Sequence, residues 1–501
     1  MLTVINPLSI QLTPAHWAAL GPFLLVLVGA MAGLLLTTLR LPGFKEPKGG
    51  VFALSLLTFL LAGAWNVVFW TKEPLTLFSG MMQLDYFSSF FNVLISGASI
   101  LVILGCRSYL NREEIEYSEF YPLLMVSSLG MMLLAASTEL LTVFMALELM
   151  SLCVYVLVGI RRFDASSNEA AIKYFIMGGV AAAVFLYGAA LIYGATSSTK
   201  LAGITAALVE NPALASNPVF VAGLVLLVAG FLFKVAAVPF HMWTPDVYEG
   251  APTLVTGYMA TVLKAAVFAS FVRVAAAVTG NGDGGRIGPL GAVFHDVVWW
   301  LALATMVLGN LAALVQKNFK RLLAYSAIAH TGYLLLGILA GPKAGYSGIL
   351  LYLVAYVCMN LGAFGVLGLF SGKLDRELSI QNFAGMGSRH PWAAGALTVF
   401  LLSLGGLPPT AGFVGKYFLF SGALEAGEWL LVLLAVATSV ISIFYYMRVV
   451  VLMYMEEGSS AIECRGARLA YLGVAICVAL TLKFGILPAA LIHTVKKAAL
   501  F

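Results

Sequence analysis

The feature that most constrains this chain is a series of about fourteen apolar segments, each long enough to cross a bilayer as a helix. Charged residues make up only 10% of its 501 residues, whereas an average soluble domain has about 25%. We therefore expect an all-α polytopic membrane protein and exclude a soluble enzyme, a disordered protein and a secreted disulfide scaffold. The segments are centred near residues 28, 60, 95, 128, 149, 182, 229, 265, 304, 331, 359, 405, 440 and 480.

Several motifs that would indicate a leader peptide or a cofactor are missing from the sequence. The start has neither a basic region nor a small-residue cleavage site, so we expect no cleaved signal peptide. The five cysteines include no CxxC pair, which disfavours disulfides and iron–sulfur ligation. No two of the six histidines share a span, which disfavours a haem bundle. With no nucleotide or metal motif either, the sequence predicts no cofactor on this chain and no nucleic-acid partner.

Basic residues are divided unequally between the two sets of loops that alternate along fourteen spans. Seventeen lie in one set and six in the other. Because Lys and Arg favour cytoplasmic loops, we expect the richer set in the cytoplasm and both termini on the other side. Arg273 and Lys483 lie toward predicted helix ends, where a long side chain can reach the membrane interface.

Four charged residues fall inside predicted spans: Glu148, Lys234, Lys264 and Lys416. Each costs about 2.5–3.5 kcal/mol at mid-membrane on insertion scales. A single intramembrane lysine can simply anchor one helix to another. Three lysines with a glutamate instead favour an ion or proton path, since such groups usually face the bundle interior. Glu148 is the candidate partner of Lys234.

Helix-breaking residues lie beside two of these lysines. Lys234 precedes Pro239, and Lys416 follows Pro408 and Pro409. Broken backbone at membrane depth is tolerated only inside protein or along a watery cavity. The breaks fall in spans 7 and 12, and this odd offset predicts two inverted five-helix repeats, although two ordinary proline kinks are the alternative. The predicted units are residues 1–115 (helices 1–3), 116–280 (helices 4–8), 281–457 (helices 9–13) and 458–501 (helix 14).

Neutral polar residues also occur within the spans. His330 is a candidate relay between the lysines, and a hydrogen-bonded packing histidine is the alternative interpretation. Asn310 and Asn360 can support bound water, but such residues more often bond across helices. These residues extend the candidate path without identifying its chemistry.

Five segments resemble the antiporter-like membrane subunits of proton-pumping NADH:quinone oxidoreductase, respiratory complex I. The resemblance covers about residues 80–455 and is most specific in the third segment. The segments are ALELMSLCVYVLVG around Glu148, SSNEAAIKYFIMGG (166–179), FKVAAVPFHMWTPDVYEGAPT (233–253), KRLLAYSAIAHTGYLLLG (320–337) and LLSLGGLPPTAGFVGKYFLF (401–420).

The resemblance implies a fourteen-helix core with two inverted repeats and broken helices 7 and 12. It implies that Glu148 and Lys234 match the family's glutamate–lysine pair. Lys264 matches the lysine on helix 8, and Lys416 matches the terminal lysine, where some related subunits carry glutamate. His330 falls on the family's central hydrophilic axis. Because no long lateral helix follows span 14, we expect this chain not to be the largest subunit of the group.

From the resemblance we expect a non-redox, proton-translocating subunit of the translocase, in a bacterial inner membrane. Its expected partners are further antiporter-like and other membrane subunits and the lipid bilayer. Quinone is expected as the substrate of the whole complex, with flavin and iron–sulfur clusters on other subunits. A subunit of a multisubunit sodium/proton antiporter is one alternative. A scaffold whose buried charges only hold helices together is another.

Overall fold

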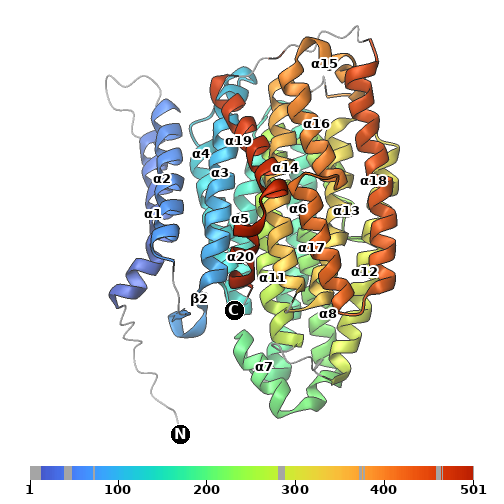
Figure 1. The fold of residues 1–501 in the computed structure, drawn as a ribbon. Coiled ribbons are helices and arrows are strands. Elements are labelled where there is room, and N and C mark those ends of the chain that lie inside the picture. The colour runs from blue at the N-terminus through green and yellow to red at the C-terminus, as the bar shows by residue number, and fades with distance from the viewer. Residues whose placement is uncertain are drawn as a thin grey trace.

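The computed structural model describes residues 13–38, 48–70, 74–279, 288–342, 344–371, 375, 378–457, 464 and 467–499. It is a bundle of roughly parallel helices with one short two-stranded hairpin (Figure 1). Within the described residues, eleven helices are long and apolar enough to cross a membrane. The expected all-α polytopic membrane fold is therefore confirmed.

The elements follow one another along the chain with short connections. The first part contains α1 (Pro14–Thr38), α2 (Lys48–Val68), β1 (Leu75–Leu77), β2 (Met82–Leu84), α3 (Tyr86–Arg112), α4 (Phe120–Ala136), α5 (Leu140–Val158), α6 (Ala165–Thr196), α7 (Leu201–Glu210), α8 (Pro218–Lys234), α9 (Thr244–Gly250), α10 (Thr253–Tyr258) and α11 (Lys264–Thr279). The second part contains α12 (Gly288–Leu314), α13 (Phe319–Ala340), α14 (Gly345–Phe370), α15 (Met386–Arg389), α16 (Pro391–Gly405), α17 (Ala411–Glu425), α18 (Trp429–Met455), α19 (Arg468–Ile486) and α20 (Ala489–Ala498).

Each of the fourteen predicted spans falls on helical structure. Eleven coincide with the long apolar helices, counting α10 and α11 as one segment, Thr253–Val278. The spans centred near residues 128, 229 and 405 fall on the shorter helices α4, α8 and α16. Eleven helices thus meet the length criterion, and the total of fourteen stays a prediction.

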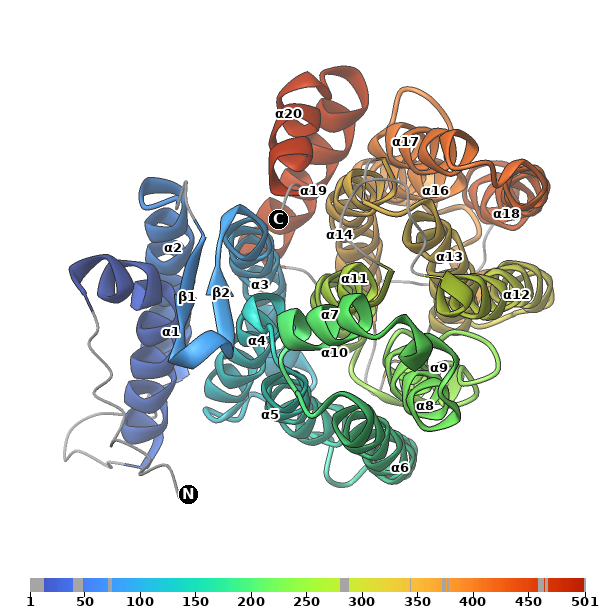
Figure 2. The same cartoon turned by 90° about the horizontal axis from the view of Figure 1, so that it is seen from below.

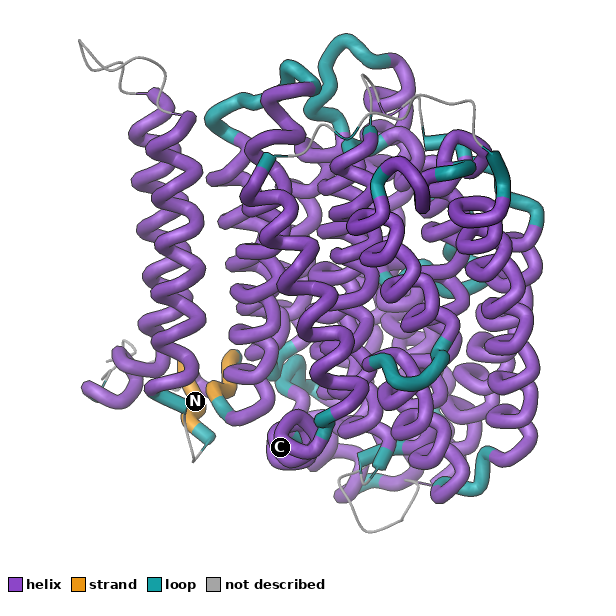
Figure 3. The backbone as a smooth tube through the Cα atoms, turned by 45° about the horizontal axis from the view of Figure 1, so that its top comes forward, coloured by secondary structure: helices purple, strands orange, loops and turns teal. Residues whose placement is uncertain are grey.

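Both predicted helix breaks are present. Between α8 and α9, Ala236 has a φ of +60° and the Val238–Pro239 bond is cis. Between α16 and α17, Gly406 has a φ of +81° and the Pro408–Pro409 bond is cis. Loop segments are correspondingly visible between the two ends of the bundle in Figure 3.

Neighbouring helices hydrogen-bond the backbone that these breaks set free. The Val238 amide donates to Thr305 Oγ1 on α12 at 3.0 Å. The Thr331 hydroxyl on α13 donates to the Val235 carbonyl at 2.7 Å. The Gly412 amide, after the second break, donates to Ser403 Oγ at 3.0 Å. The protein interior thus supplies the partners that lipid cannot.

Three segments form the centre of the bundle. In the most apolar stretch of Thr253–Val278 every residue is buried, and in those of α14 and α13 the buried residues make up 94% and 89%. Figure 2 shows α11 and α14 toward the middle and α1 and α2 at one edge, beyond the two strands. Polar side chains on the central helices therefore face protein rather than lipid.

The expectation that Arg273 extends to the membrane interface is wrong. Its side chain is 3% exposed, and Nη2 lies 2.8 Å from Asp85 Oδ1. Its Nε donates to the Ala135 carbonyl at 2.9 Å. Asp85 also caps α3 through the Ser88 amide, so the ion pair ties the strand hairpin and α3 to α11. The physical reason is that a buried carboxylate partner outweighs access to water.

Replacing Arg273 by alanine should destabilise the protein by about 3–5 kcal/mol, because Asp85 is left as an uncompensated buried charge. Thermal unfolding of the detergent-solubilised protein measures the effect. The double variant Arg273→Met/Asp85→Asn should recover much of the loss, and Lys483→Ala, at an exposed helix end, should change nothing. Equal losses in the single and double variants would contradict the ion-pair explanation.

Candidate functional site

Lys234 is the last residue of α8 and points its ammonium group at α5. Its Nζ donates to Ser151 Oγ at 2.8 Å and to Tyr155 OH at 3.1 Å. The Tyr155 ring centroid lies 5.5 Å from Nζ. Lys234 is 4% exposed. The break that ends α8 at this residue therefore places the cation inside the bundle, bonded to two hydroxyls.

Glu148 lies on the same face of α5 as these hydroxyls, since residues 148, 151 and 155 are separated by one helical turn each. Its charge acts electrostatically on Lys234. Among the described residues, however, the two form no direct ion pair, and Glu148 Oε1 is buried without a hydrogen-bond partner. A buried carboxylate oxygen without a partner is costly. The predicted partners are therefore neighbours that act on each other through space.

Lys264 lies on the buried segment Thr253–Val278. It begins α11 directly after a π-helical turn, Met259–Leu263, and π turns are frequent at functional sites. Its Nζ donates to the Ala327 carbonyl of α13 at 2.6 Å. The Tyr356 ring centroid lies 5.5 Å away. Lys264 is 2% exposed.

Thr331 connects the first two lysines. Its hydroxyl contacts the Val235 carbonyl at 2.7 Å and the Ala327 carbonyl at 3.1 Å. Val235 follows Lys234 in the chain, and Ala327 accepts the hydrogen bond of Lys264. A short series of polar contacts therefore joins the backbone beside Lys234 to the ammonium group of Lys264.

His330 on α13 lies in a group of tyrosines from α14 and α18. Its Nδ1 is hydrogen-bonded to Tyr352 OH, and its Nε2 lies 3.3 Å from Tyr446 OH. The ring centroid of Tyr356, which also lies against Lys264, is 5.3 Å from that of His330. Both Lys264 and Lys416 act electrostatically on the imidazole. A neutral imidazole donates at one nitrogen and accepts at the other, so this position permits proton transfer between hydroxyls.

Lys416 follows the second break and is bonded to the end of the preceding half-helix. Its Nζ donates to the carbonyls of Leu404 and Gly405 at 3.0 and 3.1 Å and to Ser439 Oγ at 2.8 Å. The C-terminus of a helix carries a partial negative charge, which favours a cation there. A Cβ at Gly406 would lie 2.8 Å from Lys416 Cδ, so glycine is required both for the positive φ and for space.

The structure thus brings all five predicted residues, four of them buried and Glu148 partly buried, into one polar axis, which we define as Glu148, Lys234, Lys264, His330 and Lys416. Pro239, Pro408 and Pro409 lie in the two breaks beside it. Sequence reasoning missed the hydroxyls that bond the charges, because tyrosine and serine are common in apolar helices. Helical spacing from Glu148 could have found Ser151 and Tyr155. Nothing local indicates the others, which are Tyr352, Tyr356, Ser439 and Tyr446.

The expectation that asparagines bond across helices is confirmed for Asn310. Its Nδ2 donates to Tyr333 OH at 3.0 Å, and its Oδ1 accepts from Tyr445 OH at 3.1 Å. In the described part of the chain, no three His, Cys, Asp or Glu residues are grouped so that they could hold a metal ion. The groups that the axis brings together are lysine, glutamate, histidine and hydroxyl groups.

Comparisons with known proteins place this geometry in context. A family model for the membrane region of NADH:quinone oxidoreductase and Mrp antiporters matches residues 137–442. The chain is 44% identical over 430 residues to the NADH-quinone oxidoreductase subunit N of Trichlorobacter lovleyi, covering 86% of each chain. It is similar to a chain of respiratory complex I from Thermus thermophilus with bound aureothin, at 36% identity and a TM-score of 0.79, covering 94% of this chain and 98% of that one. A chain of the Mrp complex from Dietzia shares the fold at 20% identity and a TM-score of 0.77, covering 97% and 95%.

Proposed function

The chain belongs to the NADH:quinone oxidoreductase/Mrp antiporter family of membrane proteins, and we propose that it is the proton-translocating subunit N of a bacterial NADH-quinone oxidoreductase. The names of its relatives favour this assignment over the sodium/proton antiporter, since the likeness to the Mrp complex of Dietzia, at 20% identity, is one of fold alone. As a subunit of this enzyme complex in the inner membrane, it contacts other membrane subunits and lipid. Quinone is the substrate of the complex, and flavin and iron–sulfur clusters belong to other subunits.

The observation that carries this proposal is the enclosed axis from Glu148 to Lys416. Its lysines and histidine are at most 5% exposed, and each contacts a hydroxyl or carbonyl on another helix or half-helix. Charged groups at membrane depth usually face the interior and mark ion or proton paths. Because lysine, histidine and hydroxyl groups all exchange protons, this series suits protons better than larger cations.

In the mechanism that we propose, energy from quinone reduction elsewhere changes the distance between Glu148 and Lys234. Approach of the carboxylate stabilises the protonated lysine, and separation favours transfer of its proton toward Lys264. His330 links Lys264 to Lys416, which exchanges the proton with the other side. Moving one charge against about 100 mV requires about 2.3 kcal/mol. A hydrogen bond to a charged group contributes about 1.5–3 kcal/mol, so making and breaking one such contact is sufficient.

The repeat and orientation assignments are also part of the proposal. We assign the two inverted repeats to residues 116–280 and 281–457, flanked by 1–115 and 458–501, although the boundaries near 280 and 458 fall outside the described residues. α1 begins, and α20 lies, at the same end of the bundle (Figure 1). This supports placing both termini on one side of the membrane, and the distribution of basic residues between the loops favours the non-cytoplasmic side, although residues 1–12 and 500–501 are outside the description.

Replacing Glu148 by glutamine tests the proposed function, because the amide keeps the shape and removes the charge. In the assembled complex, proton pumping should fall by about tenfold or more. Pumping is measured in inverted membrane vesicles with NADH and a pH-sensitive dye, and assembly is measured by native electrophoresis. The matched control is Glu210→Gln at the exposed end of α7, which should pump as the parent does.

The same experiment separates the alternatives. A scaffold predicts that Glu148→Gln either disrupts assembly or leaves pumping intact. An antiporter subunit predicts sodium-dependent proton exchange that needs no NADH. We expect NADH-driven pumping that continues in sodium-free buffer and is lost in the assembled variant, and pumping by the variant equal to the parent's would overturn the assignment.

A further inference from the structure

A second group of buried charges lies apart from the axis, at the end of the bundle with the basic-rich loops. We define the charge cluster as Tyr109, Glu113, Arg161, Lys320 and Asp375. Arg161 Nη2 lies 2.9 Å from Asp375 Oδ2 and 3.0 Å from Glu113 Oε2, and Lys320 Nζ lies 3.2 Å from Asp375 Oδ2. These charged side chains are at most 3% exposed. Two cations and two carboxylates are thus enclosed together.

The cluster holds the start of the buried segment Thr253–Val278, which carries Lys264. The Thr253 amide lies 3.1 Å from Asp375 Oδ2 and 2.9 Å from Tyr109 OH. Residue 252 at the cap position is a proline and forms no side-chain cap. Because the first amides of a helix need acceptors, Asp375 serves as a cap supplied by a distant loop.

The same cluster holds the start of α13. Lys320 is the second residue of α13, and its Nζ donates to the Ala251 carbonyl at 2.6 Å, two residues before Thr253. The short stretch 251–253 is thus bound twice: Asp375 accepts from the Thr253 amide, and Lys320 donates to the Ala251 carbonyl. The cluster therefore fixes the segment 253–278 and α13 relative to each other at one end.

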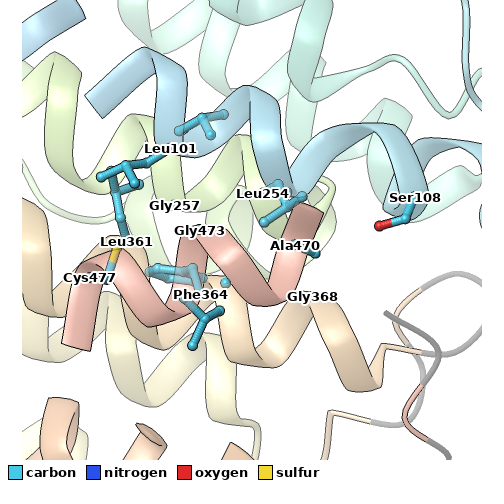
Figure 4. A pocket seen from close by; sticks show the side chains of 14 residues that line it. Leu101, Ser108, Leu254, Gly257, Leu361, Phe364, Gly368, Ala470, Gly473 and Cys477 are labelled. Carbon is cyan, nitrogen blue, oxygen red and sulfur yellow. The ribbon is translucent and has the colours of Figure 1, made fainter. Parts of the chain in front are cut away.

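Packing around Leu254 restricts lateral movement at the start of the segment 253–278. A Cβ added at Gly105 of α3 or at Gly368 of α14 would lie 3.2 Å from a methyl group of Leu254. Figure 4 shows Leu254 in the narrow pocket between these helices and α19. Small residues on both neighbours hold the side chain, so the polar contacts of the cluster are left to set the position along the helix axis.

The position set at the cluster is used again at Lys264. Lys264 is eleven residues beyond Thr253, about 16 Å along a helix, and its Nζ bonds to Ala327 on α13 at 2.6 Å. The Lys264–Ala327 contact therefore joins the segment 253–278 to α13, and the charge cluster joins the same two elements at one end. Because this bond runs across the two helices, a shift of about 2.5 Å along the axis, less than half a helical turn, would take the donor and acceptor out of hydrogen-bond range.

We propose that Asp375, together with Lys320 and Arg161, is a positioning group that sets the register of segment 253–278 against α13 and so places Lys264 for proton transfer. This inference rests on the proposed function. Burial alone would raise the pKa of Asp375, but the Lys320 and Arg161 charges outweigh it and lower the pKa to about 2. A group that stays ionised holds its partners and does not carry protons itself.

The test compares Asp375→Asn and Asp375→Glu in the assembled complex. Asparagine is the closer match in shape and tolerates the φ of +53° at this position, but it removes the charge. We expect Asp375→Asn to lower protons pumped per electron by about threefold or more, and Asp375→Glu to retain most of the pumping. A role in packing alone predicts the opposite order, with asparagine the milder change.

A double-mutant cycle with Lys264→Arg uses the same proton-to-electron ratio to measure the coupling between Asp375 and Lys264, which a purely structural role would not produce. If Asp375 acts through Lys264, Asp375→Asn should add little further loss to Lys264→Arg, since residues acting together are not additive. Multiplying losses would overturn the inference. If Asp375→Asn does not assemble, the charge-balanced Asp375→Asn/Lys320→Met is used in its place, and Glu456→Gln at the same end is the control.

The two proposals fail in different ways. Normal pumping by Asp375→Asn with impaired pumping by Lys264→Ala overturns only the positioning role. Normal pumping by Lys264→Ala overturns the proton path and the positioning role with it. Impaired pumping in both, with rescue by Asp375→Glu, supports both.

Discussion

Replacing Lys234 by alanine is expected to abolish proton pumping by the assembled complex and to lower quinone reduction by about tenfold or more. Lys234 is the group between Glu148 and the rest of the axis, and its ammonium is the donor to both Ser151 and Tyr155. Without it, the axis as we define it has no titratable side chain between Glu148 and Lys264. Dye-based pumping and NADH-driven quinone reduction, measured in the same vesicles, check both parts.

Two further variants show whether the loss arises from proton transfer. Lys234→Arg keeps the charge but does not release protons at physiological pH, so it should assemble well and pump poorly. Lys483→Ala removes a lysine from the exposed end of α19 and should behave as the parent. Restored pumping in Lys234→Arg would show that only a fixed charge is needed, which contradicts a proton-carrying role.

Replacing Lys416 by glutamate should abolish pumping and reduce assembly. Here the Leu404 and Gly405 carbonyls point at the ammonium from the C-terminus of α16. A carboxylate would face two acceptors and the negative end of a helix dipole. The expected destabilisation is several kcal/mol, because a buried charge would lose its favourable partners.

The comparison with Lys416→Gln makes this prediction specific. Glutamine is neutral and can still donate to a carbonyl, so it should assemble close to normally while it also fails to pump. Native electrophoresis gives the amount of complex, and pumping per assembled complex gives the function. Equal assembly of the glutamate and glutamine variants would contradict the role that we assign to the half-helix carbonyls.

The two breaks explain how Lys234 and Lys416 find hydrogen-bond partners inside the bundle. Lys234 ends one half-helix, and Lys416 lies in the second turn of another and bonds back to the half-helix before it. In each case the interruption supplies backbone groups and space that an unbroken helix lacks. The proline and glycine residues of the breaks therefore belong to the site as much as the charges do.

Much of the axis could be predicted from the sequence because a charged residue in a membrane-spanning helix is costly. In a helix that must be apolar, Glu148, Lys234, Lys264 and Lys416 are conspicuous without any knowledge of neighbours. Prolines near membrane depth indicate the breaks for the same reason, since the missing hydrogen bonds must be supplied inside the protein. His330 was less distinct, because histidine also packs as a neutral polar residue.

The chain alone thus determined an all-α membrane fold and the positions of its breaks, and it predicted the five residues of the axis, because the cost of burying charge in lipid is a local property of each segment. Only the tertiary structure decided which groups meet. It separated Glu148 from direct contact with Lys234, paired Arg273 with Asp85, and brought Asp375 to an amide 122 residues away. Such contacts depend on how helices pack, and helices that are apolar on every side carry little pattern from which their packing can be predicted.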